Sequence, residues 1–455
     1  MLLTGVGLTR KYLAVSLALV LAVGFVACQP GSPTQGESAG DVGDPGYSTG
    51  AEEVMVDRIV YLSGAGDVFT IDPDGGNAID LTGGAQVSAG PQGRVMAQSI
   101  DFNNFYFWPT WAPDGTKLAV SRVENSGPRP VMTIEVLDPF GGGRRNIYQN
   151  EVPSVIAQDA PHYLYWSPDS RYLGFLVSTP EAFSLLVADT EGTGPPLVAQ
   201  TGAPLYFHWG VGGDKLLLHT GDDLKLSEKP FASPPANIAD VGQGFRVPAL
   251  EPGGTRMAYV AADGERSALF IAETGSVDLA KSILEVGAPA AIAWAPDGRK
   301  LAVVDTQDPN ARLYDRLRVV EADGDAVQTV AEEAVVAFFW SPGGDKIAWV
   351  ALEPEQRSFQ WKAAGADGSG ERDLFTYQPS SGSLIMLTFF DQYAYSHSPW
   401  SPDGTRLVVT GTKTEPFVRR NGETPKGDRV YILDAEGVAP PSELAEGNLA
   451  FWSWN

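Results

Sequence analysis

The sequence predicts an all-β protein that forms a single β-propeller of four-stranded blades. A motif centred on a Pro-Asp-Gly turn recurs along most of the chain, and its copies lie 41 to 60 residues apart, a period typical of propeller blades. The composition agrees, because 51 Gly, 34 Pro and 11 Trp among 455 residues suit short strands joined by tight turns. The number of repeats favours eight blades, with seven as the alternative.

The chain opens with a segment that is typical of a bacterial export signal. Two basic residues precede the apolar stretch 13–27, which ends in small residues before Cys28. That stretch is shorter than the ~20 apolar residues of a membrane-spanning helix. The residues Phe-Val-Ala-Cys at 25–28 resemble the lipoprotein cleavage box, in which the Cys becomes the N-terminus and is acylated. We therefore predict a lipoprotein signal peptide at 1–27 and lipidation of Cys28, with ordinary secretion as the alternative.

Residues 28–56 form the predicted connection between the lipid and the folded body. The segment is rich in Gly, Ser, Pro and acidic residues, and it contains almost nothing that a hydrophobic core could bury. A flexible tract of this kind has an r.m.s. reach of roughly 25–30 Å. We therefore expect it to act as a tether that holds the folded body off a membrane surface.

The propeller is predicted for residues 57–455, where each repeat supplies four strands, A to D. The clearest copies of the repeat read WAPDGTKLAV, WAPDGRKLAV and WSPDGTRLVV. The Pro-Asp-Gly turn closes a hairpin, because Pro presets φ, Asp bonds nearby amides and Gly accepts a positive φ. Strand A ends at the first residue of the motif, and strand B is the apolar run after the turn. These first residues, the anchors, are Trp111, Trp166, Trp209, Leu250, Trp294, Trp340 and Trp400.

The two ends of the propeller region complement each other. The region opens at 58–62 with a strand of type B and then supplies strands C and D, so the first blade lacks its strand A. Residues 448–455 read as a single strand A, whose anchor Trp452 lies 52 residues after Trp400. We predict that this C-terminal strand joins the N-terminal blade and closes the ring, which removes open strand edges.

These motifs resemble the TolB-like propeller family, whose repeat reads approximately W-S-P-D-G-x-x-[IL]-[AV]-[FV], followed later by D-x-D-G-x-x-x-x-L-T. The segment IDPDGGNAIDLT at 71–82 is close to the second half of that repeat. The resemblance covers residues 57–455 and implies a propeller. Related repeats occur in periplasmic scaffolds and in propellers attached to prolyl-oligopeptidase-type peptidases, so the resemblance implies a stand-alone relative of these proteins.

Charge and composition exclude several classes of function. The net charge of −24 argues against nucleic acid as a partner, since a phosphate backbone needs a basic surface. The single Cys excludes an internal disulfide and a zinc site built on Cys. His162, His208 and His397 precede their anchors by four, one and three residues, and alternation along a strand then argues against one shared metal site. We predict no catalytic residues, metal or cofactor.

Long loops predict the face on which a partner binds. The short Pro-Asp-Gly turns share one face of the propeller, whereas the B–C and D–A connections share the other face and carry every long insertion. Trp361 is expected on an insertion at 353–371, and Tyr395 and His397 at the start of an inner strand. Aromatic and Arg residues on such loops are the usual anchors of an interface. The candidate partner-binding residues are Tyr106, Trp108, His162, Tyr163, Tyr206, Phe245, Arg246, Trp361, Tyr395, His397, Arg419 and Arg420.

We therefore interpret the chain as a lipid-anchored module of the cell envelope that binds a protein, peptide or glycan partner without catalysis. The lipid would attach it to the cell membrane or the outer membrane, facing the periplasm or the cell exterior. The alternative is a propeller enzyme, such as a lyase or hydrolase that acts on a polymer at the mouth of the channel.

Overall fold

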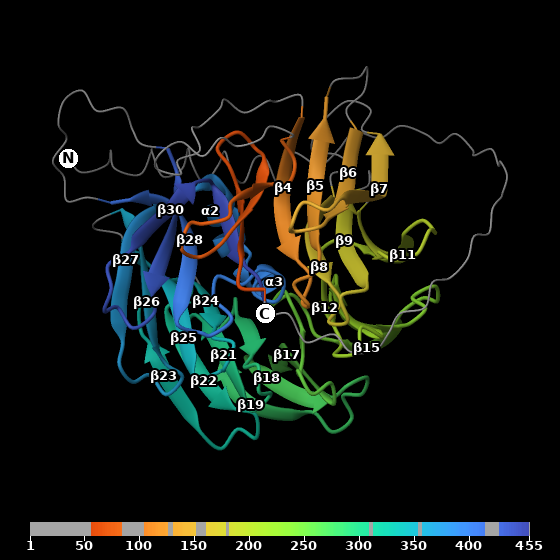
Figure 1. Cartoon of the computed structure of the whole chain (residues 1–455). Helices are drawn as coiled ribbons and strands as arrows, with labels where there is room; N and C mark the ends of the chain where they lie inside the picture. The colour runs from red at the N-terminus through yellow and green to blue at the C-terminus, as the bar shows by residue number, and fades with distance from the viewer. Residues whose placement is uncertain are drawn as a thin grey trace, which may run out of the picture.

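The structure, a computed structural model, describes residues 56–83, 104–125, 131–151, 161–178, 182–308, 313–353, 357–414 and 427–454. The predicted signal peptide, Cys28, the tether up to residue 55, Arg419 and Arg420 lie outside these ranges. Within the described ranges, the strands form seven antiparallel sheets that stand in a ring around a central axis (Figure 1). The prediction of an all-β propeller is therefore confirmed.

Six of these sheets hold four strands each, and each sheet corresponds to one repeat of the sequence. We number them as blades in their order along the chain. Blade 1 consists of β31 (Leu449–Trp452), β1 (Ile59–Leu62), β2 (Val68–Ile71) and β3 (Ile79–Asp80). Blade 2 consists of β4 (Asn104–Trp111), β5 (Leu118–Glu124), β6 (Val131–Leu137) and β7 (Arg144–Glu151). Blade 3 consists of β8 (Pro161–Trp166), β9 (Tyr172–Ser178), β10 (Phe183–Asp189) and β11 (Leu197–Gly202).

The next three blades follow the same order of strands from the centre outward. Blade 4 consists of β12 (Leu205–Trp209), β13 (Lys215–Thr220), β14 (Asp223–Glu228) and β15 (Ala236–Asp240). Blade 5 consists of β16 (Ala249–Leu250), β17 (Arg256–Asp263), β18 (Arg266–Glu273) and β19 (Lys281–Val286). Blade 6 consists of β20 (Ala291–Trp294), β21 (Lys300–Asp305), β22 (Arg316–Glu321) and β23 (Val327–Ala331).

The last sheet holds seven strands, because two repeats share it. Blade 7 consists of β24 (Val335–Trp340), β25 (Lys346–Glu353), β26 (Ser358–Gly365) and β27 (Arg372–Pro379). Blade 8 consists of β28 (Arg406–Lys413), β29 (Arg429–Asp434) and β30 (Ser442–Glu446). Its inner strand is reduced to a bridge between Trp400 and Leu407, and β27 pairs with β28. With this sheet counted as two repeats, the described strands make up the eight predicted blades.

The C-terminal strand closes the ring as predicted. β31 pairs antiparallel with β1, from Ile59 opposite Trp452 to Leu62 opposite Leu449. All four residues of β31 are buried. The pairing continues one residue further, because the amide of Ser453 donates to the carbonyl of Arg58 at 2.9 Å. The first blade therefore combines the two ends of the propeller.

The anchor tryptophans pack between blades and link them. Six of the indole N–H groups donate to the carbonyl of the residue that precedes the anchor of the previous blade, whereas that of Trp452 donates to the carboxylate of Asp57. In blade 5 the anchor is Leu250, and there the backbone amide donates to Nδ1 of His208 instead, at 3.3 Å. The indole bonds run from Trp111 to Phe451 (3.3 Å), Trp166 to Thr110 (3.0 Å), Trp209 to Tyr165 (3.0 Å), Trp294 to Ala249 (3.2 Å), Trp340 to Ala293 (3.2 Å) and Trp400 to Phe339 (3.1 Å).

The turn aspartates serve the local turns, as expected for this chemistry. Asp114, Asp297 and Asp403 each accept a hydrogen bond from the backbone N–H two residues later, at 2.9, 2.9 and 3.0 Å. The Gly that follows each of them has a φ between 65° and 70°, a region that favours glycine. These carboxylates are therefore structural parts of the hairpins.

A helical segment that the sequence analysis did not predict fills the centre of the ring. Helices α2 (Ser381–Thr388) and α3 (Phe390–Tyr393) lie between β27 and Trp400, and Figure 1 shows α3 near the middle of the ring. Ser380 caps α2, because its Oγ accepts from the amide of Ser383 at 3.1 Å. We call residues 380–399 the plug. It accounts for the 60-residue interval before Trp400, the longest between anchors.

Candidate functional site

The plug contacts the inner wall of the propeller mainly through aromatic side chains. The ring of Tyr393 stacks on Trp108 of blade 2 at 4.8 Å and meets the ring of Tyr163 of blade 3 edge-on at 5.4 Å. The hydroxyl of Tyr163 donates to the carbonyl of Gln392 at 2.8 Å. Tyr393 and Tyr163 are both buried. The plug is therefore packed as part of the core.

Two backbone irregularities direct wall residues toward the plug. Trp108 and Tyr163 each have a φ of 53°, which is uncommon for residues other than glycine. In both inner strands the pairing register shifts at this point, between Phe107 and Thr110 and between His162 and Tyr165. A β-bulge of this kind re-aims side chains that simple alternation would place elsewhere. The two bulges bring the rings of Trp108 and Tyr163 onto the plug.

The side of the plug that faces blades 4, 6 and 7 also packs against the inner wall. Phe390 packs edge-on against Phe338 of blade 7, with ring centroids 5.0 Å apart. The hydroxyl oxygen of Tyr395 accepts from the backbone amide of Trp294 at 3.2 Å, and its ring lies 4.2 Å from that of His208. These contacts extend the packing of the plug to blades 4, 6 and 7.

Two buried histidines, His397 within the plug and His208 on the wall beside it, are held in neutral form. Nε2 of His397 lies 3.0 Å from Oγ1 of Thr110, and its ring packs on Phe451 at 4.4 Å. Burial lowers the pKa of His397 to about 3, and it lowers the pKa of His208 to about 3 as well. Among the residues that the structure describes, no group of three or more His, Cys, Asp or Glu side chains could hold a metal ion.

One charged pair fastens the plug at the mouth of the channel. Arg246 donates to Asp391 of the plug through Nε at 2.8 Å, and its Nη2 lies 2.6 Å from the other carboxylate oxygen. Nη1 of Arg246 donates to the carbonyl of Thr388 at 3.2 Å, and the guanidinium lies 5.2 Å from the centre of the Phe389 ring. The side chain of Asp391 is 2% exposed, whereas that of Arg246 is 25% exposed. The outer edge of Arg246 therefore reaches solvent.

Two tyrosines complete the surroundings of this arginine. Burial and the charge of Asp391 raise the pKa of Tyr314 to about 12, against the opposing charge of Arg246. Burial also raises the pKa of Tyr206, and the charge of Arg246 opposes that rise. Tyr206, Tyr314 and Phe389 are half-buried. We call Tyr206, Arg246, Tyr314 and Phe389 the Arg246 rim, which is the candidate functional site.

The structure gathers only part of the predicted set of partner-binding residues. Trp108, Tyr163 and Arg246 meet at the plug, and Tyr206 lies on the rim. Other members take structural roles. Tyr106 is buried and accepts from Nη1 of Arg144 at 3.2 Å, Phe245 is buried and stacks on His219 at 4.7 Å, and His162 lies edge-on to Phe183 at 5.5 Å.

Three placements need correction. Trp361 lies in strand β26 and is 2% exposed, packed against Phe339 at 5.8 Å, so the prediction that it stands on an insertion is wrong. Tyr395 and His397 follow α3 within the plug, where an inner strand was predicted. The sequence analysis also missed Phe389, Asp391 and Tyr314, although the aromatic run at 389–395 was a signal that this segment packs inside the protein.

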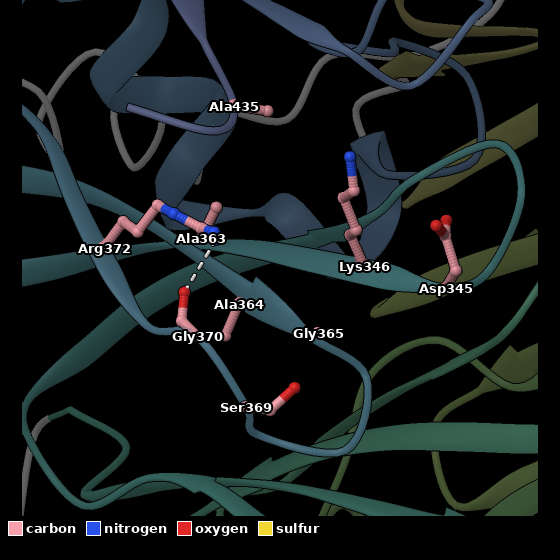
Figure 2. A pocket seen from close by; sticks show the side chains of 9 residues that line it. All are labelled: Asp345, Lys346, Ala363, Ala364, Gly365, Ser369, Gly370, Arg372 and Ala435. Carbon is pink, nitrogen blue, oxygen red and sulfur yellow. Dashed lines mark hydrogen bonds between the residues drawn. The ribbon is translucent and has the colours of Figure 1, made fainter. Parts of the chain in front are cut away.

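A hollow lies on the face that carries the A–B and C–D turns, between blades 7 and 8, and Figure 2 shows the side chains that line it. Its volume is about 220 Å³, and Lys346 and Arg372 supply its basic groups. Both pair with Glu436, at 2.7 and 3.0 Å. Because these charges are already matched, we place the candidate site at the Arg246 rim.

Together, the fold and this site define a β-propeller whose central channel is closed by a segment of its own chain. None of the helices in the described part of the chain is long and apolar enough to span a bilayer. No protein-family model and no curated protein matches the sequence.

Solved structures similar to this chain are other propellers and related proteins. TolB from Acinetobacter baumannii matches with 14% identity over 69% of this chain and 62% of that chain, with a TM-score of 0.36. The chain therefore covers less than two thirds of TolB. A eukaryotic initiation factor matches with 13% identity over 87% and 98% of the two chains (TM-score 0.50), and an oligogalacturonate lyase from Vibrio parahaemolyticus with 13% over 73% and 85% (TM-score 0.45). At these identities, likeness indicates the fold alone.

Proposed function

We propose that this protein is a lipid-anchored binding module of the bacterial cell envelope, which holds a protein, peptide or glycan partner without catalysing a reaction. The partner would bind at the face where the plug closes the channel. The signal-like N-terminus and Cys28 support export and anchoring, and the Arg246 rim supports binding on this face.

The observation that carries the proposal is the partial exposure of Arg246 within an aromatic border. Nε and Nη1 of Arg246 donate to Asp391 and Thr388, Nη2 lies 2.6 Å from the second carboxylate oxygen of Asp391, and the Tyr314 hydroxyl lies beside the same guanidinium. At most two N–H groups therefore remain for a partner's carbonyl, carboxylate or hydroxyl oxygen. Because Asp391 holds the guanidinium in place, little side-chain entropy is lost when a partner binds. Arg and aromatic residues are enriched at such anchoring positions.

The plug also argues against chemistry inside the channel. Its buried side chains pack against the inner wall of the propeller, and several of its polar groups are paired with that wall. Tyr163 is bonded to Gln392, His397 to Thr110, and Asp391 to Arg246. A partner would therefore contact the outer surface of the plug and its border. Arg419 and Arg420, on the connection between β28 and β29, remain predicted contacts of the same face.

Capture of partners from native membranes tests the proposal. Tyr206→Ala and Phe389→Ala should weaken capture and leave the fold intact, because both side chains are half-buried at the rim. Tyr172→Ala is the matched control, since Tyr172 is a half-buried tyrosine beside the Pro-Asp-Ser turn on the opposite face. Equal capture by all three variants would contradict the rim as the binding site. Stoichiometric Mn, Zn or Ca in the purified protein would instead favour the propeller enzyme.

A further inference from the structure

We infer that the face opposite the Arg246 rim rests on the surface of a zwitterionic phospholipid bilayer through three apolar turn tips. This face carries the A–B and C–D turns, and we call it the turn face. The inference rests on the proposed lipid anchor at Cys28. It adds an orientation, in which the turn face meets the membrane and the rim points away from it.

The large apolar side chains that are exposed among the described residues all lie on the turn face. Each lies in an A–B turn, in a C–D turn, or within the first two residues of a strand D that leaves such a turn. These residues form no single patch, but all of them point to one side of the propeller, and apolar side chains on one side can enter a membrane interface together. They are Phe140, Leu197, Val198, Val211, Leu279, Val327 and Val438.

Three of these residues lie at the tips of C–D turns, near the outer edge of the ring of blades. Phe140 is 54% exposed, and Leu279 and Val438 are each 86% exposed. They belong to blades 2, 5 and 8, so they are separated around the ring by three, three and two blades. Three contacts spread in this way define a plane. A flat, extended apolar layer fits them better than a partner that inserts into a groove.

The chain enters the propeller on the same face. Val56 lies against the A–B turn of blade 2, where a β-carbon added to Gly115 would be 3.0 Å from the Cβ of Val56. Asp57 accepts from Nε1 of Trp452 at 2.5 Å. Residues 29–55 join this entry point to Cys28, and their composition predicts a reach of roughly 25–30 Å. A lipid on Cys28 would therefore keep the turn face within reach of the membrane. Contact through the tips would then replace the clearance that the tether alone would give.

The charges beside the tips suit phospholipid headgroups. An exposed basic residue begins a strand D beside each tip: Arg144 near Phe140, Lys281 near Leu279 and Arg372 near Val438. Arg144 and Arg372 also contact Glu135 and Glu436, at 3.9 and 3.0 Å, so the charge of this face is largely balanced within the protein. Long basic side chains can reach phosphate while apolar neighbours enter the interface. The same turns carry Asp138, Asp278 and Glu436, which disfavour a strongly anionic surface. Zwitterionic phospholipid is therefore the surface that this face fits.

The test uses the full chain, produced with its signal in a bacterial host and reconstituted into phosphatidylcholine vesicles. Cys28 is the only Cys, so a Cys introduced elsewhere can carry a single environment-sensitive fluorophore once Cys28 is acylated. Phe140→Cys, Leu279→Cys and Val438→Cys place the label at the three tips. Ser381→Cys places it on an exposed residue of α2 at the opposite face. Nitroxides on the lipid tails should quench the three tip labels and leave the Ser381 label unquenched.

A second variant tests whether the tips act together. With the label at Leu279→Cys, the additional changes Phe140→Ser and Val438→Ser should lower quenching toward the level of the Ser381 label. Quenching that is equal at the tips and at Ser381 overturns the inference, and so does a tip signal that changes only when envelope proteins are added. Intact mass separates the two proposals. Acyl mass on Cys28 with unquenched tips overturns the orientation alone, whereas a chain without acyl mass overturns the anchor.

Discussion

Nε1 of Trp166 donates a 3.0 Å hydrogen bond to the carbonyl of Thr110 in the preceding blade, and the side chain of Thr110 in turn contacts the plug. Oγ1 of Thr110 lies 3.0 Å from Nε2 of His397. The repeated anchor tryptophan, the inner strand of its neighbour and the plug are therefore linked in one buried chain of contacts. The contact between two neighbouring blades and the closure of the channel therefore share Thr110.

Replacement of one anchor tests the link between blades. Trp166→Phe keeps an aromatic ring but leaves the buried carbonyl of Thr110 without its donor, so the free energy of unfolding should fall by about 1–3 kcal/mol. Trp454→Phe, which changes a half-buried tryptophan, is the control and should cost less. Denaturant unfolding measures both. Equal losses for the two variants would show that the indole hydrogen bond adds nothing.

Deletion of residues 449–455 tests closure of the ring. Leu449, Phe451 and Trp452 are at most 3% exposed, and burial of each such side chain contributes about 1.5–3 kcal/mol. The deletion also leaves β1 as an open edge. The truncated chain should melt far below the intact chain or fail to fold. A melting temperature within a degree or two of the intact chain would contradict closure by β31.

The sequence predicted the ring because its repeat combines two strong signals. Pro-Asp-Gly turns mark the hairpins, and apolar runs mark strands covered on both faces. The composite blade followed from the unmatched strands at the two ends, and the pairing of β1 with β31 confirms it. These features are local or periodic, so they can be read without knowledge of the tertiary contacts.

The plug could not be predicted in the same way. Residues 381–393 form a short apolar run that occurs once, and such a run does not distinguish a helix from a strand. The bulges at Trp108 and Tyr163 also defeated simple alternation, because each redirects a side chain onto the ring of Tyr393. Trp361 was misplaced because β26 was taken for part of an insertion.

Stability should depend on pH through the buried histidines. Burial places the folded-state pKa of His397 at about 3, below the unfolded value of about 6.5. As pH falls below that unfolded value, the unfolded chain takes up a proton that the folded protein does not, so stability is lost. For one such group the loss between pH 7 and pH 5 is roughly 2 kcal/mol.

His397→Gln removes this contribution and should make the free energy of unfolding less dependent on pH between pH 7 and pH 5. The amide can still bond Thr110, so the fold should be retained. His162→Gln, at a half-buried position in β8, the inner strand of blade 3, is the matched control. If the pH dependence of His397→Gln equals that of the unchanged protein, the residue is not held neutral by burial.

The ion pair at the mouth should stabilise the closed plug. Arg246→Ala leaves the carboxylate of Asp391 buried and unpaired, which typically costs 3–5 kcal/mol, somewhat less here because Arg246 is partly exposed. Asp391→Asn retains hydrogen bonding but removes the charge and should cost less. A double-mutant cycle on the free energy of unfolding measures the coupling. Additive losses would show that the two residues do not act as a pair.

The plug itself should be a rigid part of the core, and Tyr393 is the residue that decides this. Its ring lies between Trp108 and Tyr163 and is 4% exposed. Tyr393→Ala would open a cavity and should lower the free energy of unfolding by about 3–5 kcal/mol. The positive φ of Trp108 and Tyr163, a conformation that costs on the order of 1–3 kcal/mol, would also lose the contact that maintains it.

Hydrogen exchange separates this role from that of a movable lid. If the plug is part of the core, the amides of residues 384–397 in the unchanged protein should exchange as slowly as those of the inner strands, since local opening requires loss of buried contacts. Tyr393→Ala should accelerate exchange in this segment, whereas Tyr393→Phe, which keeps the ring, should change it little. Rapid exchange of 384–397 in the unchanged protein, with no loss of stability in Tyr393→Ala, would mean that the channel opens readily and that partners can enter it.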